Sequence, residues 1–201
     1  MPEPDAQPAD GVDRGTRLSG HEADEDDNEY ATPAHLWRPL SRAVDGFDLD
    51  PASGAESTPI APERYTEDDD GLSKAWFGDV WLNPPWSSNG DGTAKKRWLR
   101  KARNEANRDA VNTVTVCLPA DTDSHAFHDH ITAAPVWCLV GPGRIPFVGE
   151  DRNPTFTLVL AVFGDPPDAL VDALDQFGAV VRGSTLVDEH PQATLGVSAR
   201  E

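Results

Sequence analysis

The clearest chemical feature of the chain is the run Asn83-Pro84-Pro85-Trp86. It directly follows residues 79–82, an apolar segment that is expected to form a strand. Two prolines in a row stop strand pairing and fix an extended turn, because each ring locks φ and restricts the residue before it. Such a turn holds the Asn83 side-chain oxygen and the Pro84 carbonyl as rigid acceptors for the two hydrogens of a planar amino group, on whose ring Trp86 could stack. The alternative is a proline-rich loop around a buried tryptophan.

A second candidate is Asp50, which ends an expected strand over residues 47–50 and is followed by Pro51 and small residues. Small residues let a backbone approach a ligand closely. A carboxylate at this place could accept a hydrogen bond from an amine or a ribose hydroxyl. A helix N-cap is an equally good interpretation of the same residue.

Basic residues cluster directly after the Asn83 motif, where seven of the chain's 17 Lys and Arg residues fall within 14 positions. A helix over residues 93–110 would place Lys96, Arg100 and Arg103 on one face, where they could contact phosphates. The alternative is a solvated face paired with the acidic surface. Arg144, in a glycine-rich segment, is a further candidate for contact with phosphate or base. The predicted nucleic-acid contacts are Lys95, Lys96, Arg97, Arg100, Lys101, Arg103 and Arg144.

Histidines and cysteines do not indicate a metal site. Asp121, His125 and His128 are spaced permissively, but no cysteine supports them, and a polar helix capped by Asp121 is the preferred interpretation. Cys117 and Cys138 both lie in apolar segments and are expected to be buried free thiols.

The elements that must position these residues alternate between strands and helices. Helices are expected over residues 34–44, 93–110 and 168–177, the first of them capped by Thr32 and interrupted at Pro39. Strands are expected over residues 47–50, 79–82, 111–118, 136–140, 156–163 and 179–182. This alternation predicts an open α/β sheet with helices on both faces, in which ligands bind at the carboxyl ends of strands.

Composition divides the 201 residues into one domain and two tails. Residues 1–28 are acidic with few large apolar side chains, so they are expected to be a disordered tail. Residues 29–187 form the expected domain, and residues 188–201 a C-terminal tail. The absence of a signal-like N-terminus and of an apolar run of about 20 residues favours a soluble intracellular protein.

The formal net charge of −18 opposes nucleic-acid binding on average, since affinity for DNA comes largely from neutralising phosphates. The chain has 35 acidic residues, and Arg far outnumbers Lys among its bases. This balance fits the protein of an extreme halophile. In strong brine the Debye length is about 3 Å, so the local distribution of charge decides what binds.

The order of motifs over about residues 30–163 resembles the phage-encoded DNA N-6-adenine methyltransferases. The combination is more specific than the Asn83 motif alone, which amino-methyltransferases share. The motifs are, in chain order, Thr32-Pro33, Asp48-Leu49-Asp50-Pro51-Ala52, Asp70-Gly71-Leu72, Asn83-Pro84-Pro85-Trp86, Leu118-Pro119-Ala120-Asp121-Thr122 and Gly143-Arg144-Ile145-Pro146-Phe147.

The resemblance implies an S-adenosylmethionine-dependent enzyme that methylates adenine N6 in double-stranded DNA, in the cytoplasm of a host cell. It implies a catalytic role for Asn83, Pro84, Pro85 and Trp86, with Asn in a position where Asp is common. It implies cofactor contacts for Thr32, Pro33, Asp48, Asp50, Pro51 and Asp70.

The resemblance also implies a reduced Rossmann-like methyltransferase sheet, because the interval from Asp50 to Asn83 is short. Residues 55–77 can hold two short strands and one turn of helix at most. Two alternatives remain open. The substrate could be cytosine N4 or a protein glutamine amide, or the chain could be a DNA-binding scaffold without catalysis.

Overall fold

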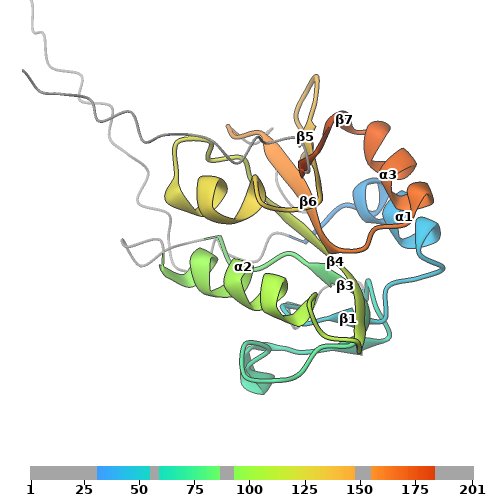
Figure 1. The fold of residues 1–201 in the computed structure, drawn as a ribbon, viewed down its shortest axis with the longest axis vertical. Helices are drawn as coiled ribbons and strands as arrows, with labels where there is room; N and C mark the ends of the chain where they lie inside the picture. The colour runs from blue at the N-terminus through green and yellow to red at the C-terminus, as the bar shows by residue number, and fades with distance from the viewer. Residues whose placement is uncertain (1–30, 55–58, 87–92, 148–154, 184–201) are drawn as a thin grey trace, which may run out of the picture.

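A computed structural model of the chain describes residues 31–54, 59–86, 93–147 and 155–183. Both predicted tails lie outside these residues. The described strands form one seven-stranded sheet in the order β2-β1-β3-β4-β6-β5-β7 (Figure 1). The strands are β1 (Leu49–Asp50), β2 (Glu63–Arg64), β3 (Gly78–Leu82), β4 (Val111–Pro119), β5 (Val136–Val140), β6 (Leu158–Gly164) and β7 (Gly178–Arg182).

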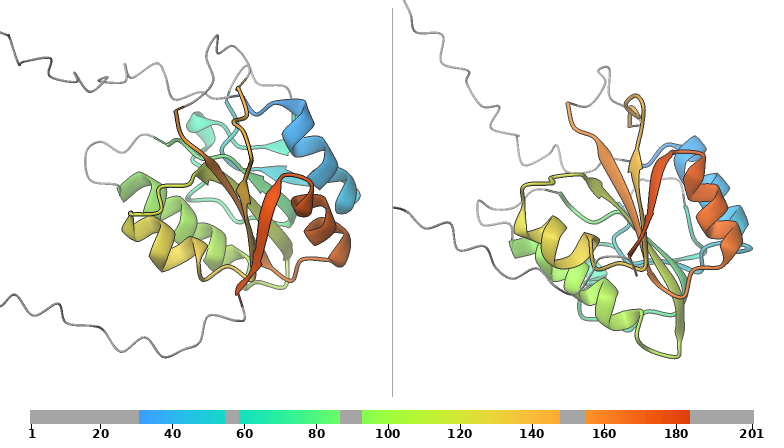
Figure 2. Two further views of the ribbon diagram at one scale, coloured as in Figure 1. Left: turned by 90° about the horizontal axis from the view of Figure 1, so that it is seen from above. Right: turned by 45° about the horizontal axis from the view of Figure 1, so that its top comes forward.

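Helices cover both faces of this sheet, as predicted. On one face α1 (Ala34–Ala43) and α3 (Asp168–Asp175) lie side by side (Figure 2). On the other face α2 (Thr93–Glu105) packs beside the π-helix η3 (Phe127–Ile131). The structure is therefore a mixed α/β fold in three layers.

The sheet is parallel on one side and antiparallel on the other. Strands β2, β1, β3 and β4 pair in parallel, whereas β6 runs antiparallel to both β4 and β5, and β7 antiparallel to β5. The carboxyl ends of β1, β3, β4 and β5 therefore meet at one edge, which we call the carboxyl edge. The segments after these strands carry most of the predicted site residues.

The core has two parts, one on each face of the sheet. Leu82, Val116 and α2 residues such as Leu99 form the first, and Trp81, Leu160 and α1 residues such as Leu36 form the second. All of these side chains are fully buried. Alternate residues along β3 and β4 face opposite layers, so both strands read as continuous apolar runs.

The two cysteines confirm the prediction of buried free thiols. Both lie in the core beneath α1 and α3. Burial raises the pKa of Cys117 to about 12 and that of Cys138 to about 11. Neither thiol is therefore a reactive nucleophile at neutral pH.

Two helix boundaries differ from the sequence prediction. The N-cap of α1 is Pro33, with no side-chain cap, so the prediction that Thr32 caps it is wrong, and the helix continues through Pro39. Helix α2 ends at Glu105, five residues early, where Arg108 N donates to Glu105 O in a tighter turn. The Glu105 side chain is drawn into the core there, and the chain then turns into β4.

The short interval between β1 and β3 holds the strand β2 and the 3-10 turn η2 (Glu67–Asp69) among its described residues. This agrees with the expectation that the segment is too short for full strand–helix units. No helix among the described residues is long and apolar enough to span a membrane.

Candidate active site

The site lies where the order of strands reverses. From β1 the chain continues outward to β2, whereas from β3 it continues in the opposite direction to β4. In open α/β sheets such a reversal leaves a crevice at the carboxyl ends of the two strands, and ligands bind there. Leu49 pairs with Val80, so Asp50 and Asn83 end neighbouring strands at this reversal. The structure thus brings together the two strand ends that the sequence singled out.

The Asn83 motif leaves β3 as an extended turn in which Pro84 is buried and Pro85 is exposed. Asn83 is half-buried, and its Nδ2 donates to Thr32 Oγ1 across 3.2 Å. Thr32 and Asn83 are both predicted site residues, and their predicted roles are separate. Their contact joins the segment before α1 to the segment after β3.

Trp86 stands among aromatic rings. It packs edge-to-face against Phe147, with ring centroids 4.9 Å apart, and against Phe156, at 5.2 Å. It also contacts the cores on both faces of the sheet. Sequence analysis did not single out Phe156. The feature that could have identified Phe156 is its position just before β6. The amino end of β6 reaches the carboxyl edge because that strand runs antiparallel to β4.

Asp50 is a buried carboxyl group at the end of β1, with 5% of its surface exposed. Burial raises its pKa to about 7, and the hydrogen bond from Ala52 N and the charge of Arg64 only partly oppose this effect. The Ala52 bond is 3.3 Å long. A carboxylate has about four acceptor sites, so Asp50 keeps the capacity to bind hydroxyl or ammonium donors.

Asp48 occupies the opposite edge of the sheet. Its Oδ2 accepts from Asp79 N at 2.8 Å, and its own N donates to Asp79 O at 2.7 Å. A Cβ on Gly78 would come within 2.1 Å of this carboxylate oxygen. The carboxylate thus fastens the start of β3 to the segment leading into β1.

The segment that carries Asp70 lies directly beside Pro51. A Cβ on Gly71 would meet Pro51 O at 2.0 Å, so only glycine fits this contact. Asp70 itself is exposed, with a positive φ of 52°. The structure therefore brings Asp70 and Pro51, two predicted cofactor contacts, to neighbouring segments.

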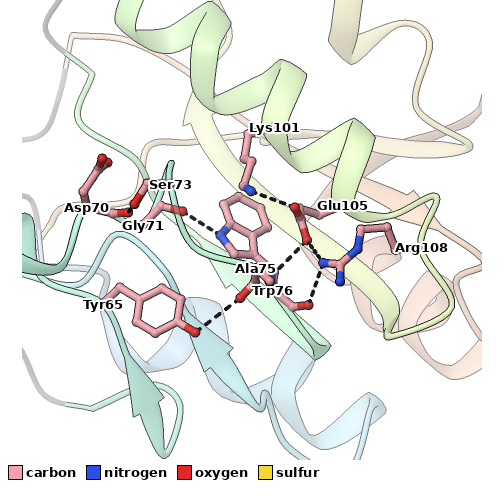
Figure 3. A network of polar contacts seen from close by, with 9 residues as sticks. All are labelled: Tyr65, Asp70, Gly71, Ser73, Ala75, Trp76, Lys101, Glu105 and Arg108. Carbon is pink, nitrogen blue, oxygen red and sulfur yellow. Dashed lines mark hydrogen bonds and ion pairs between the residues drawn. The ribbon is translucent and has the colours of Figure 1, made fainter.

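A polar network connects this segment to α2 (Figure 3). The Trp76 indole donates to Gly71 O at 2.9 Å, and Trp76 N donates to Glu105 at 2.9 Å. Lys101 and Arg108 both pair with the same Glu105 carboxylate. Burial by itself raises the pKa of Glu105, but the hydrogen bonds from Lys101, Trp76 and Arg108 hold it below its ordinary value.

The predicted nucleic-acid contacts on α2 divide into two groups. Lys95 pairs with Asp121 at 2.6 Å and Lys101 with Glu105 at 2.7 Å, so these two lysines match the alternative of cations paired with acids. Their side chains are only 14% and 19% exposed. Neither lysine is displayed as an open basic contact.

The second group is more open to solvent. Arg97, Arg100 and Arg103 are exposed, and Lys96 is half-buried. The pKa of His130, on η3, is lowered by burial and by the charges of Arg103, Arg100 and Lys96, although Asp129 opposes this. Positions 96, 100 and 103 fall on one face of a helix, so these three cations share one side of α2, as the helical spacing predicted. Arg144 is exposed in the segment between β5 and Phe147.

Other predicted features near the site have different partners. Phe127 N donates to Ser124 Oγ at 3.1 Å, so Ser124 takes the capping role that was predicted for Asp121. His128 contacts Thr122 O at 2.8 Å. Across residues 31–183, the described part contains no group of three or more His, Cys, Asp or Glu side chains that could hold a metal ion.

A cavity of about 500 Å³ lies at the edge of the sheet opposite the candidate site. It is lined by Val111 at the start of β4, Gly164 at the end of β6, and Arg103, among others. Of the predicted site residues it includes only Arg103. The candidate site is thus defined by the strand ends and not by this cavity.

Comparison with known proteins identifies the family of the chain. A search of curated proteins gave no match. A family model described as DNA N-6-adenine-methyltransferase (Dam) matches residues 19–157, more than half of the chain. The matched range includes the ends of β1 and β3, the Asn83 motif and α2. The chain therefore belongs to the DNA N-6-adenine-methyltransferase (Dam) family.

Proposed function

We propose that the protein transfers a methyl group from S-adenosylmethionine to adenine N6 in double-stranded DNA. The observation that carries the proposal is the placement of Asn83 and Asp50 on neighbouring strands at the reversal of strand order. One strand end offers acceptors for an amine, and the other offers a buried carboxyl group. Family membership supplies the substrate class.

The residues at the two strand ends fit the cofactor. Asp50, buried and with acceptor capacity to spare, suits the hydroxyl or ammonium donors of such a ligand. The tight contact between Gly71 and Pro51 brings Asp70 to the same region, and Thr32-Pro33 borders it through Asn83. When bound, S-adenosylmethionine supplies an electrophilic sulfonium methyl group.

The Asn83 motif would hold the substrate amine. The Asn83 and Pro84 oxygens accept its two hydrogens, which draws the nitrogen lone pair away from the ring and makes it a better nucleophile. Trp86 stacks on the base, a contact worth about 1–3 kcal/mol. The base must leave the duplex to reach this turn, because its amino group is otherwise paired. Positioning of this kind supplies most of the rate enhancement.

The duplex would lie against the open cations of α2. Lys96, Arg100 and Arg103 share one side of the helix that begins directly after the Asn83 segment. Arg97 and Arg144 are exposed as well. These residues would contact phosphates, which position the DNA without reading its sequence.

The proposed origin and host of the enzyme rest on features of the sequence. The resemblance to phage-encoded enzymes supports a viral or prophage origin and action on DNA in the host cytoplasm. The charge of −18 with few lysines supports a halophilic host, since high salt screens an acidic surface.

The experiment that tests the proposal is mass spectrometry of nucleosides from DNA incubated with the protein and S-adenosylmethionine, at low and high salt. N6-methyladenine is the expected product. N4-methylcytosine would keep the Asn83 site and overturn the choice of base. The absence of any methylated nucleoside at either salt concentration would contradict the proposal, and calorimetry with the cofactor would then separate a different substrate from a scaffold.

A further inference from the structure

We infer that Thr32 is a positioning residue for the catalytic amide: its hydroxyl holds the Nδ2 end of Asn83, so that the Oδ1 end is offered to the substrate amine. The inference rests on the proposed function, in which Asn83 accepts from that amine. It assigns the Thr32 hydroxyl to Asn83 in place of the cofactor contact that the family resemblance implies.

The contact joins residues that are 51 positions apart. Thr32 lies before α1, Asn83 lies after β3, and Nδ2 donates to Oγ1 at 3.2 Å. The Thr32 hydroxyl makes no helix cap, because the N-cap of α1 is Pro33. Pro33 is buried, which anchors the neighbouring Thr32 beside the turn. The hydroxyl is therefore placed for a tertiary contact and not for a local one.

Orientation matters because the two ends of an amide have nearly the same shape and opposite hydrogen-bonding character. The oxygen accepts, whereas the NH₂ group only donates. An amine that met Nδ2 would place donor against donor. Packing alone barely distinguishes the two orientations, so hydrogen bonds must set them. In this structure the Thr32 hydroxyl accepts from Nδ2, which leaves its own proton for another acceptor.

An aspartate at position 83 would need no such help, because its two oxygens are equivalent. The role of Thr32 should therefore depend on the residue at position 83. Removal of the hydroxyl should slow the native Asn83 enzyme, and it should have little effect when position 83 carries a carboxylate. A contact to the cofactor, or a general contribution to folding, would act equally in both backgrounds.

The test compares Thr32→Val, which keeps the shape and removes the hydroxyl, with Thr32→Ser, which keeps the hydroxyl. Single-turnover methyl transfer to DNA is expected to fall about tenfold in Thr32→Val and to stay within about twofold in Thr32→Ser. Cofactor affinity, measured by calorimetry, should change less than about twofold in both. In the Asn83→Asp background, Thr32→Val should cost less than about twofold in rate.

A second readout does not depend on activity. The side-chain amide protons of Asn83, followed by ¹⁵N NMR in the free protein, should exchange faster in Thr32→Val than in the wild type or Thr32→Ser. This measurement decides the matter if Asn83→Asp is inactive.

Three results would overturn the inference. They are an unchanged exchange rate in Thr32→Val, an equal loss of rate in both backgrounds, and a loss of cofactor affinity as large as the loss of rate. A wild-type protein that transfers no methyl group to DNA would instead contradict the proposed function, and the NMR comparison would still test the contact.

Discussion

Asp50 is a buried carboxyl group at the carboxyl edge of the sheet, and its titration should be visible in the stability of the protein. Its folded pKa is about 7 because burial disfavours the charge. The unfolded chain loses this proton near pH 4. Between these values the folded state binds more protons, so the free energy of unfolding falls as pH rises through this range. Each pKa unit is worth about 1.4 kcal/mol.

Asp50→Asn should remove this fall in the free energy of unfolding. The variant is expected to be more stable than the wild type at about pH 8 and to lose that advantage towards about pH 5. Urea denaturation at both pH values measures the free energy of unfolding. The matched control is Asp68→Asn, at an exposed position. An equal pH dependence in Asp50→Asn and the wild type would show that Asp50 ionises normally.

At the scale of the element, α2 carries two kinds of cation. Arg100→Gln combined with Arg103→Gln should weaken DNA binding and lower the slope of log affinity against log salt by about 2, because each phosphate contact contributes about 1. Fluorescence anisotropy with duplex DNA across a salt series measures the slope. The double variant Arg38→Gln with Arg42→Gln, on α1 across the sheet, removes the same charge and should leave the slope unchanged. Equal slopes in both double variants would contradict the assignment of α2 as the DNA-binding helix.

Glu105 fastens the C-terminal end of α2 to the segment before β3. Glu105→Ala should lower the free energy of unfolding by about 3 kcal/mol, since it leaves Trp76 N and two cations without their shared carboxylate. Denaturant titration checks this value, and the exposed Glu67→Ala should change stability by less than about 0.5 kcal/mol. A loss below about 1 kcal/mol in Glu105→Ala would mean that the network contributes little.

Some of the helix and strand bounds could be predicted from the sequence, and others could not. The apolar runs of β3, β4 and β5 were placed to within one residue, because burial on both faces demands such runs. The strand β2 has two residues, Glu63 and Arg64, and no apolar pattern that would reveal it. The end of α2 was placed too late because Glu105 looks like any exposed helical acid until Trp76 contacts it.

Tertiary contacts account for the remaining differences at the site. Thr32 has the sequence context of a cap, yet its hydroxyl serves Asn83. Sequence could not distinguish Lys95 and Lys101 from the open cations. The pairing of Lys95 with Asp121 depends on tertiary packing, and that of Lys101 with Glu105 depends on the side-chain rotamers. Asp50 and Asn83 were identified correctly as strand ends, because each follows an apolar run, but that their strands are neighbours is seen only in the pairing of β1 with β3.

At the scale of the whole molecule, the net charge of −18 should make stability depend on salt. Repulsion among like charges opposes the compact state, and salt screens it. Thermal unfolding in about 3 M KCl should therefore occur at a higher temperature than in about 0.1 M KCl. NaCl at equal ionic strength is the control for a specific effect of potassium. A melting temperature that is independent of salt would contradict the proposal of a halophilic protein.

The most direct test of the account is single-turnover methyl transfer by Asn83→Ala, beside cofactor binding by the same variant. Transfer to adenine is expected to be abolished while S-adenosylmethionine binds with the affinity of the wild type, because Asn83 accepts from the substrate amine. Asn83→Asp, which keeps an acceptor oxygen, should retain measurable transfer. Wild-type transfer by Asn83→Ala would show that the amine is held elsewhere and would contradict the central claim.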